Sequence, residues 1–149
     1  MERQQALAAL ASALTGRHSA IRYWRSLLGL LVCIITYLAL TPAPPPQATF
    51  GWDKLNHIAA FGALGGVATM GFAGAWARTG GGLIAYGVLI EVLQSFTPAR
   101  NAEWGDLLAD GVGITVGMPA ARLAQTIAGA AMRRSDLKRC TANRHGLGS

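Results

Sequence analysis

Side chains that could do chemistry stand where one apolar run ends and the next begins. Glu91 and Gln94 lie three residues apart near the end of the apolar run at residues 83–96, and Arg100 follows this run. Asp106 and Asp110 lie four residues apart at the start of the next and last apolar run. Acidic side chains inside a membrane span cost several kcal/mol unless they are paired or hydrated, so by default they mark a functional site. We therefore expect a carboxylate-rich site where these two runs meet.

Another apolar run is preceded by the polar residues Asp53, Lys54 and His57. Asp53 and His57 are four residues apart, as are Asp106 and Asp110, so each pair lies on one face of a helix. This spacing predicts that three helices direct their polar stripes into one shared pocket. Asp53 and Asp106 could also act simply as N-caps of their helices.

Two functions fit these residue types, and both stay open. In a binding site, Lys54 and Arg100 would hold an anionic headgroup of a membrane lipid or lipid-linked envelope molecule through charge-assisted hydrogen bonds. Asp106, Gln94 and His57 would supply further hydrogen bonds to this ligand. The candidate ligand-binding residues are Asp53, Lys54, Gln94, Arg100 and Asp106.

The second function is an intramembrane hydrolase or transferase that acts on such a lipid. Glu91 or Asp110 would be the general base, and His57 would shuttle the proton. Arg100 would stabilise the charge that develops in the reaction. The candidate catalytic residues are therefore Glu91, His57 and Asp110. We predict no metal and no other cofactor, because His57, Glu91 and Asp106 come from separate elements and show no metal-binding spacing.

A purely structural interpretation is also open, in which the polar residues only order the helices. Arg100 would then be the counter-ion of Glu91 or Asp106. Function would lie in the cytoplasmic tails instead. Glu91→Gln and Asp110→Asn would be tolerated, whereas truncation after Ala131 would not.

The bulk composition favours a membrane protein. The chain has 149 residues, of which 52% are hydrophobic and 13% are charged, against roughly 25% charged residues in soluble domains. A single domain of this length cannot bury so much apolar surface in one soluble core. Its 13 lysines and arginines mostly flank the apolar runs, which is typical of topology signals and argues against a nucleic-acid partner.

The apolar runs predict an all-α fold, a compact bundle of four transmembrane helices. The expected spans cover about residues 24–41, 57–76, 79–96 and 105–127. The first run could instead belong to a signal peptide, although more than twenty residues would then precede its apolar region. The second run is rich in glycine and alanine, and Gly113 and Gly117 continue the polar stripe of the fourth, so close helix packing is expected.

The two ends of the chain are assigned to the cytoplasm. Residues 1–22 are predicted to form a tail or a membrane-surface helix, and residues 131–149 a basic, disordered tail after the membrane domain 23–130. With both termini inside, the inner segments hold 11 of the 13 lysines and arginines, as the positive-inside rule expects. The outer loops hold only Lys54 and Arg100. The polar cluster would therefore face outward.

These residues resemble the VanZ-like family, small bacterial membrane proteins associated with teicoplanin resistance. The matching motifs are Asp53-Lys54-x-x-His57-x-x-x-Phe61, Glu91-x-x-Gln94-x-Phe96-x-Pro98-x-Arg100 and Asp106-x-x-x-Asp110-x-x-Gly113-x-x-x-Gly117. The family usually has asparagine at the position of Asp110, so this chain carries an extra titratable group. The resemblance implies a multi-pass protein of the bacterial inner membrane that contributes to glycopeptide or envelope-stress resistance, with no generally established reaction.

Overall fold

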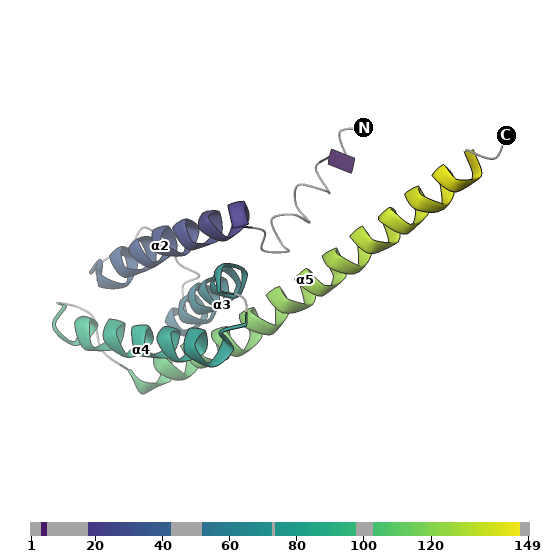
Figure 1. The fold of residues 1–149 in the computed structure, drawn as a ribbon. Coiled ribbons are helices and arrows are strands. Elements are labelled where there is room, and N and C mark those ends of the chain that lie inside the picture. The colour runs from purple at the N-terminus through teal and green to yellow at the C-terminus, as the bar shows by residue number, and fades with distance from the viewer. Residues whose placement is uncertain (1–3, 6–17, 43–51, 73, 98–102, 147–149) are drawn as a thin grey trace.

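A computed structural model describes residues 4–5, 18–42, 52–72, 74–97 and 103–146 of the chain. These residues form helices and contain no strand, so the all-α prediction is confirmed. The principal helices are α2 (His18–Leu40), α3 (Asp53–Gly71), α4 (Trp76–Ser95) and α5 (Trp104–Gly146). Figure 1 shows α2, α3 and α4 gathered along the N-terminal half of α5, whose C-terminal half projects away from them.

The helix ends follow from local chemistry. α2 stops two residues before Pro42, because proline lacks the amide proton that would continue the helix. α3 starts at Asp53, but the N-cap position is Trp52, and no side chain caps it. The interpretation of Asp53 as an N-cap is therefore wrong, and so is that of Asp106, because α5 begins at Trp104, two residues before it. As the first helical residue, the Asp53 carboxylate still lies at the positive end of the helix dipole.

Glycines bring α3 and α5 into backbone contact. A Cβ atom added at Gly113 would lie 2.5 Å from the carbonyl oxygen of Ile58 and 2.8 Å from the amide nitrogen of Gly62. A Cβ atom at Gly117 would overlap the carbonyl oxygen of Gly62. No larger residue fits at these positions, so the predicted seam of small residues is confirmed.

The buried core is small and lies around α3. Its members are Phe61, Leu64, Ala68, Leu83, Ile114 and Met118. Large apolar side chains are instead exposed on every helix, including Tyr37 (70% exposed) on α2, Leu89 (52%) on α4 and Val116 (62%) on α5. Soluble monomers rarely expose apolar surface so widely, so most of the bundle's exterior fits an apolar surrounding better than water.

Two helices are long and apolar enough to cross a membrane, at Ala20–Leu40 and Trp104–Ser135. Helices also form over the other two predicted spans, as α3 and α4. Both begin earlier than predicted, at residue 53 instead of 57 and at residue 76 instead of 79. Only part of the N-terminal tail, residues 1–22, is described, so the surface helix expected there stays a prediction.

The C-terminal segment differs from the prediction. We expected a disordered tail after Ala131, whereas α5 continues as helix to Gly146. Extending an existing helix needs no new nucleation. The sequence from Ala130 to Arg139 contains neither glycine nor proline, and methionine, leucine, lysine and arginine are good helix formers.

Candidate functional site

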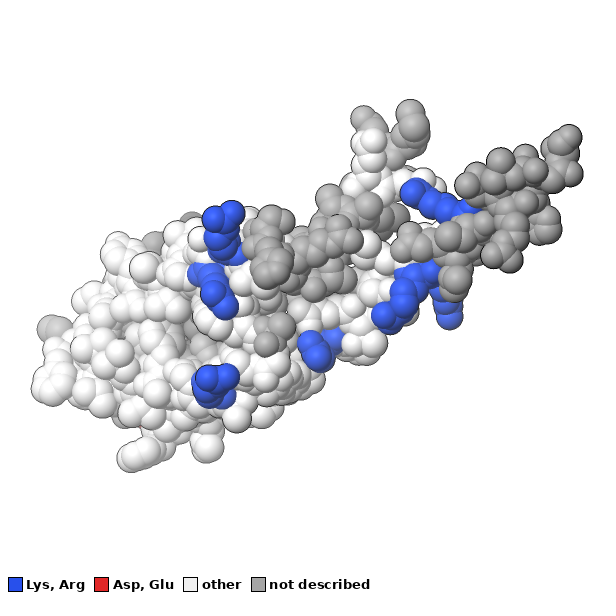
Figure 2. Space-filling model, viewed as in Figure 1, with Lys and Arg blue, Asp and Glu red and all other residues white. Residues whose placement is uncertain are grey.

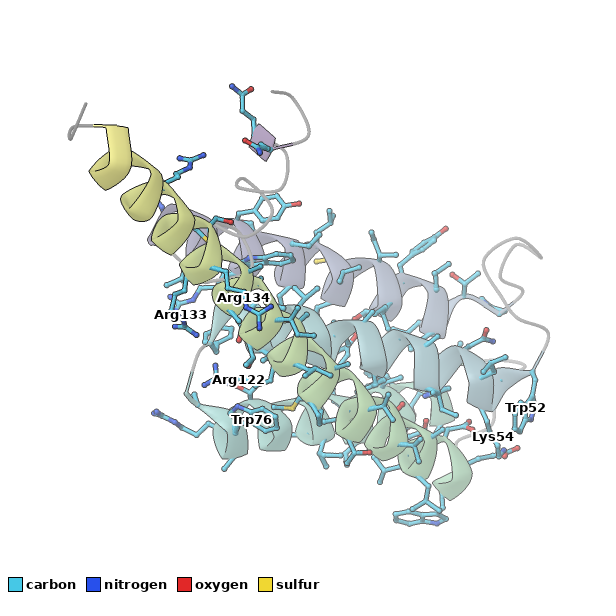
Figure 3. The ribbon with its side chains drawn as sticks, turned by 90° about the vertical axis from the view of Figure 1, so that its right-hand side faces the viewer. Trp52, Lys54, Trp76, Arg122, Arg133 and Arg134 are labelled. Atoms are coloured by element: carbon cyan, nitrogen blue, oxygen red, sulfur yellow. The ribbon has the colours of Figure 1, made fainter. Side chains whose placement is uncertain are left out.

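Acidic side chains gather at one end of the bundle, where α3 and α5 begin and α4 ends. This end, called the acidic end below, holds Asp53, Glu91, Glu103, Asp106 and Asp110, five of the chain's seven acidic residues. Figure 3 shows Trp52 and Lys54 at the acidic end, with Trp76, Arg122, Arg133 and Arg134 toward the opposite end. The predicted convergence of polar residues from several helices is therefore seen in the fold.

His57 of α3 and Asp110 of α5 form the centre of the site. The Nδ1 atom of His57 lies 2.8 Å from Oδ1 of Asp110, and both side chains are buried. Because an ionised carboxylate only accepts hydrogen bonds, Nδ1 of the imidazole donates this one. The His57 ring also stacks on Phe61, with their planes 6° apart. The ring is thus held in both orientation and tautomer.

The second oxygen of Asp110 lies against α4. Asp110 has no exposed surface, and its Oδ2 atom has no hydrogen-bond partner among the described residues. A Cβ atom at Gly87 would lie 2.5 Å from Oδ2. The glycine therefore makes room for a buried carboxylate between α4 and α5.

Asp106 lies between His57 and Lys54. Its Oδ2 atom is 3.9 Å from Nε2 of His57, and its Oδ1 atom is 3.6 Å from Nζ of Lys54. Lys54 donates a shorter hydrogen bond, of 2.8 Å, to Oε2 of Glu103. This hydrogen bond and the nearby Asp106 carboxylate stabilise the charge of the Lys54 ammonium. Lys54 is therefore already paired with two carboxylates, those of Glu103 and Asp106.

Asp53 completes a compact group with His57 and Asp106. One possible donor atom from each of these three residues lies within 4.8 Å of the other two. Asp53 is exposed, whereas His57 and Asp106 are buried. Their donor set, one imidazole nitrogen and two carboxylates, is of a kind that binds divalent transition metals.

Glu91 lies beside this cluster, at a pocket between α4 and α5. Its Oε2 atom accepts a 2.9 Å hydrogen bond from the backbone N–H of Glu103, and its Oε1 atom is buried without a partner among the described residues. The pocket has a volume of about 260 Å³. It is lined by Val88, Glu91, Val92, Ser95, Glu103, Trp104 and Leu107.

Glu103 was missed at the sequence level, although it connects the two parts of the site. Its carboxylate holds Lys54, and its backbone N–H holds Glu91. An acidic residue immediately before the first residue of a helix was the available signal, because such residues interact favourably with the helix dipole.

One other predicted site residue, Gln94, lies away from the site. Gln94 is buried, and its Nε2 atom donates a 3.0 Å hydrogen bond to the carbonyl oxygen of Ala39 on α2. It therefore joins α4 to α2 and is not among the residues that line the pocket. Arg100 lies outside the described residues, so its predicted role stays a prediction.

The charge balance of the site limits its chemistry. Among the described residues, five carboxylates face one lysine and one histidine at the acidic end. An anion there would be repelled by the carboxylates and would have to displace Glu103 or Asp106 from Lys54. A metal cation, an amine or a hydroxyl donor fits this balance better.

Comparison with family models, with curated proteins and with solved structures found no match for this chain. The resemblance to the VanZ-like family therefore stays a prediction that depends on the spaced motifs. Four of the motif residues, Lys54, His57, Asp106 and Asp110, do meet in one network.

Proposed function

We propose that the chain is a multi-pass protein of the bacterial inner membrane, with four spans and both termini in the cytoplasm. α3 and α4 have 19 and 20 residues, which at 1.5 Å per residue is about 30 Å, the thickness of the hydrocarbon layer. The apolar exterior of all four helices supports this arrangement, because lipid would cover it.

The distribution of charge supports the orientation. Figure 2 shows lysine and arginine side chains at one end of the helix bundle and along α5, with no acidic side chain visible on this face. Arg25 and Arg78 line one groove at this end, and Arg122, Arg133 and Arg134 follow on α5. The positive-inside rule puts this end in the cytoplasm and turns the acidic end outward.

The proposed function is binding of the polar headgroup of a lipid or lipid-linked envelope molecule at the acidic end. The observation that carries it is the pocket between α4 and α5, which combines apolar walls with the carboxylates of Glu91 and Glu103. Apolar walls with a few polar groups are typical of small-molecule sites. Carboxylates accept hydrogen bonds, so the matching headgroup carries hydroxyl or amine donors, as a glycolipid does.

Lipid-binding mass spectrometry on the purified protein tests this proposal. Val92→Trp would fill the pocket, and Val116→Trp is the matched control, since Val116 is exposed on α5 and does not line the pocket. We expect co-purified glycolipid to be lost in the first variant and kept in the second. An unchanged lipid profile in Val92→Trp would contradict the proposal.

A second candidate function is favoured by the His57–Asp110 pair. A buried carboxylate that orients an imidazole is the arrangement that lets histidine act as a general base. The protein would then be a hydrolase or transferase for the same class of lipid. The resemblance to the VanZ-like family adds a contribution to glycopeptide resistance as its cellular consequence.

A deletion strain separates binding from catalysis. The strain would be complemented with wild type, Glu91→Gln or His57→Asn, and its lipids and wall precursors would be compared. Catalysis predicts that a substrate accumulates in both variant strains. Profiles identical to wild type, together with retained lipid binding, would leave binding as the function.

A further inference from the structure

We infer that Asp53, His57 and Asp106 bind a divalent transition-metal ion, of the Zn²⁺ or Mn²⁺ class, at the acidic end. The inference goes beyond the proposed lipid binding and does not depend on it. Two of the three donors are buried, and the third, Asp53, lies on the exposed first turn of α3. An ion could therefore enter from outside the bundle.

The spacing of the donors fits a single ion. Nitrogen and oxygen donors lie about 2.1 Å from Zn²⁺, so the donors around one tetrahedral ion are about 3.4 Å apart. The three donor atoms here lie within 4.8 Å of one another. The widest pair must therefore close by up to about 1.4 Å, which side-chain rotations of the exposed Asp53 and of Asp106 would have to supply.

Asp110 gives His57 the orientation that a metal ligand needs. The Nδ1 atom of His57 donates to Asp110, so the neutral imidazole keeps its lone pair on Nε2. That atom is directed toward Asp106, 3.9 Å away. Metal-binding histidines almost always donate their other ring nitrogen to a carboxylate or carbonyl group in this way, which fixes the tautomer.

Asp106 points independently to a cation. The residue is 2% exposed, and its Oδ1 atom accepts no hydrogen bond from the residues that the structure describes. A buried ionised carboxylate is costly unless it is paired or bound to a metal. Its described cationic neighbour, Lys54, lies 3.6 Å from Oδ1 and makes its closer contact with Glu103.

Lys54 is therefore the competitor of the proposed ion. If its ammonium alone balances Asp106, the cluster needs no metal. If a metal occupies the cluster, replacing Lys54 by methionine removes a competing positive charge and tightens metal binding. In the first case wild type binds no ion, whereas in the second it binds one and Lys54→Met binds it more tightly.

The test uses full-length protein purified in detergent without a polyhistidine tag and stripped with a chelator. Zn²⁺ and Mn²⁺ are titrated by calorimetry, and the bound metal is counted by elemental analysis. We expect one ion per chain and no stoichiometric binding in Asp106→Asn or His57→Gln. Asp110→Asn, which changes only the partner of His57, should weaken binding by about 10- to 100-fold.

Two further variants keep the result interpretable. Asp53→Asn removes an exposed ligand, so it tests the site even if the buried variants fail to fold. Ser135→Ala is the control, since Ser135 lies on α5 outside the acidic end and its exposed hydroxyl donates to the Ala131 carbonyl, so its metal binding should equal that of wild type. The inference is overturned if wild type binds no stoichiometric ion, or if Asp53→Asn and Lys54→Met both bind as wild type does.

Discussion

Replacing Gly113 by alanine tests the contact that brings α3 and α5 together. The added Cβ atom would lie 2.5 Å from the Ile58 carbonyl oxygen and 2.8 Å from the Gly62 amide nitrogen. Both are backbone atoms of α3, so no side chain can move aside to relieve the clash. Ordinary contact begins near 3.4 Å, so α3 and α5 must separate locally by about 0.9 Å.

The expected cost follows from two opposing effects. Overpacking against rigid neighbours costs about 1–3 kcal/mol, and the upper value applies because the obstacles are backbone. Alanine in place of glycine within a helix stabilises the helix by about 1 kcal/mol. We therefore expect Gly113→Ala to lower the free energy of unfolding by about 2 kcal/mol.

The Gly113→Ala substitution should also disturb the contact between His57 and Asp110. Ile58 follows His57 in the chain, and Gly113 lies one helical turn after Asp110. A separation of about 0.9 Å added to the 2.8 Å hydrogen bond between His57 and Asp110 would exceed the usual limit for such a bond. Gly113→Ala should therefore weaken whatever activity or binding the cluster supports, as well as stability.

Gly111→Ala is the matched control for this experiment. Gly111 lies in the same helix, and a Cβ atom there would meet nothing within 4 Å. It should stabilise the protein by about 0.5–1 kcal/mol. Unfolding in mixed detergent micelles, followed by circular dichroism, compares the two variants. If Gly113→Ala proves as stable as Gly111→Ala, the close contact between α3 and α5 is not as described.

Two polar links between α2 and α4 give further predictions. Gln94→Leu removes the hydrogen bond to the Ala39 carbonyl and should cost about 1 kcal/mol in the same unfolding assay, since it leaves this partly buried acceptor without its partner. Tyr86→Phe removes the hydroxyl bonded to Thr36 while keeping the ring, and should cost about 1 kcal/mol. Thr115→Val is the control for both variants, because its hydroxyl is exposed and bonds within α5. If Thr115→Val lowers the free energy of unfolding as much as Gln94→Leu and Tyr86→Phe do, the links between α2 and α4 contribute nothing specific.

Much of the site could be predicted because helical spacing fixes which residues share a face. The pair on α3, Asp53 and His57, does meet the pair on α5, Asp106 and Asp110, at one end of the bundle. The glycine seam explains why these two helices lie so close together. The spacing inside a helix does not fix how far each helix turns about its axis. Contacts between helices decide that rotation, and they directed Gln94 toward α2 instead of the pocket.

The relative importance of the carboxylates could not be predicted for the same reason. Sequence reasoning weighted Glu91 and Asp110 equally, because both interrupt apolar runs. Packing at Gly87 and Gly113 instead places Asp110 against His57 and leaves Glu91 at a neighbouring pocket. Glu103 precedes its helix, where acidic residues are common, so its position is a weak signal and its contact with Lys54 assigns it to the site.

The central claim is that four helices cross the membrane and turn the acidic end outward. Single cysteines at Trp52, Arg78 and Arg134, in a background without Cys33 and Cys140, can be tested with a membrane-impermeant maleimide on intact cells. All three positions are exposed. Position 78 decides between the possible topologies, because it lies outside if only α2 and α5 cross and inside if all four do. We predict labelling at position 52 alone until the cells are permeabilised. Labelling of position 78 in intact cells would contradict the four-span arrangement, and protection of position 52 would contradict an outward-facing site.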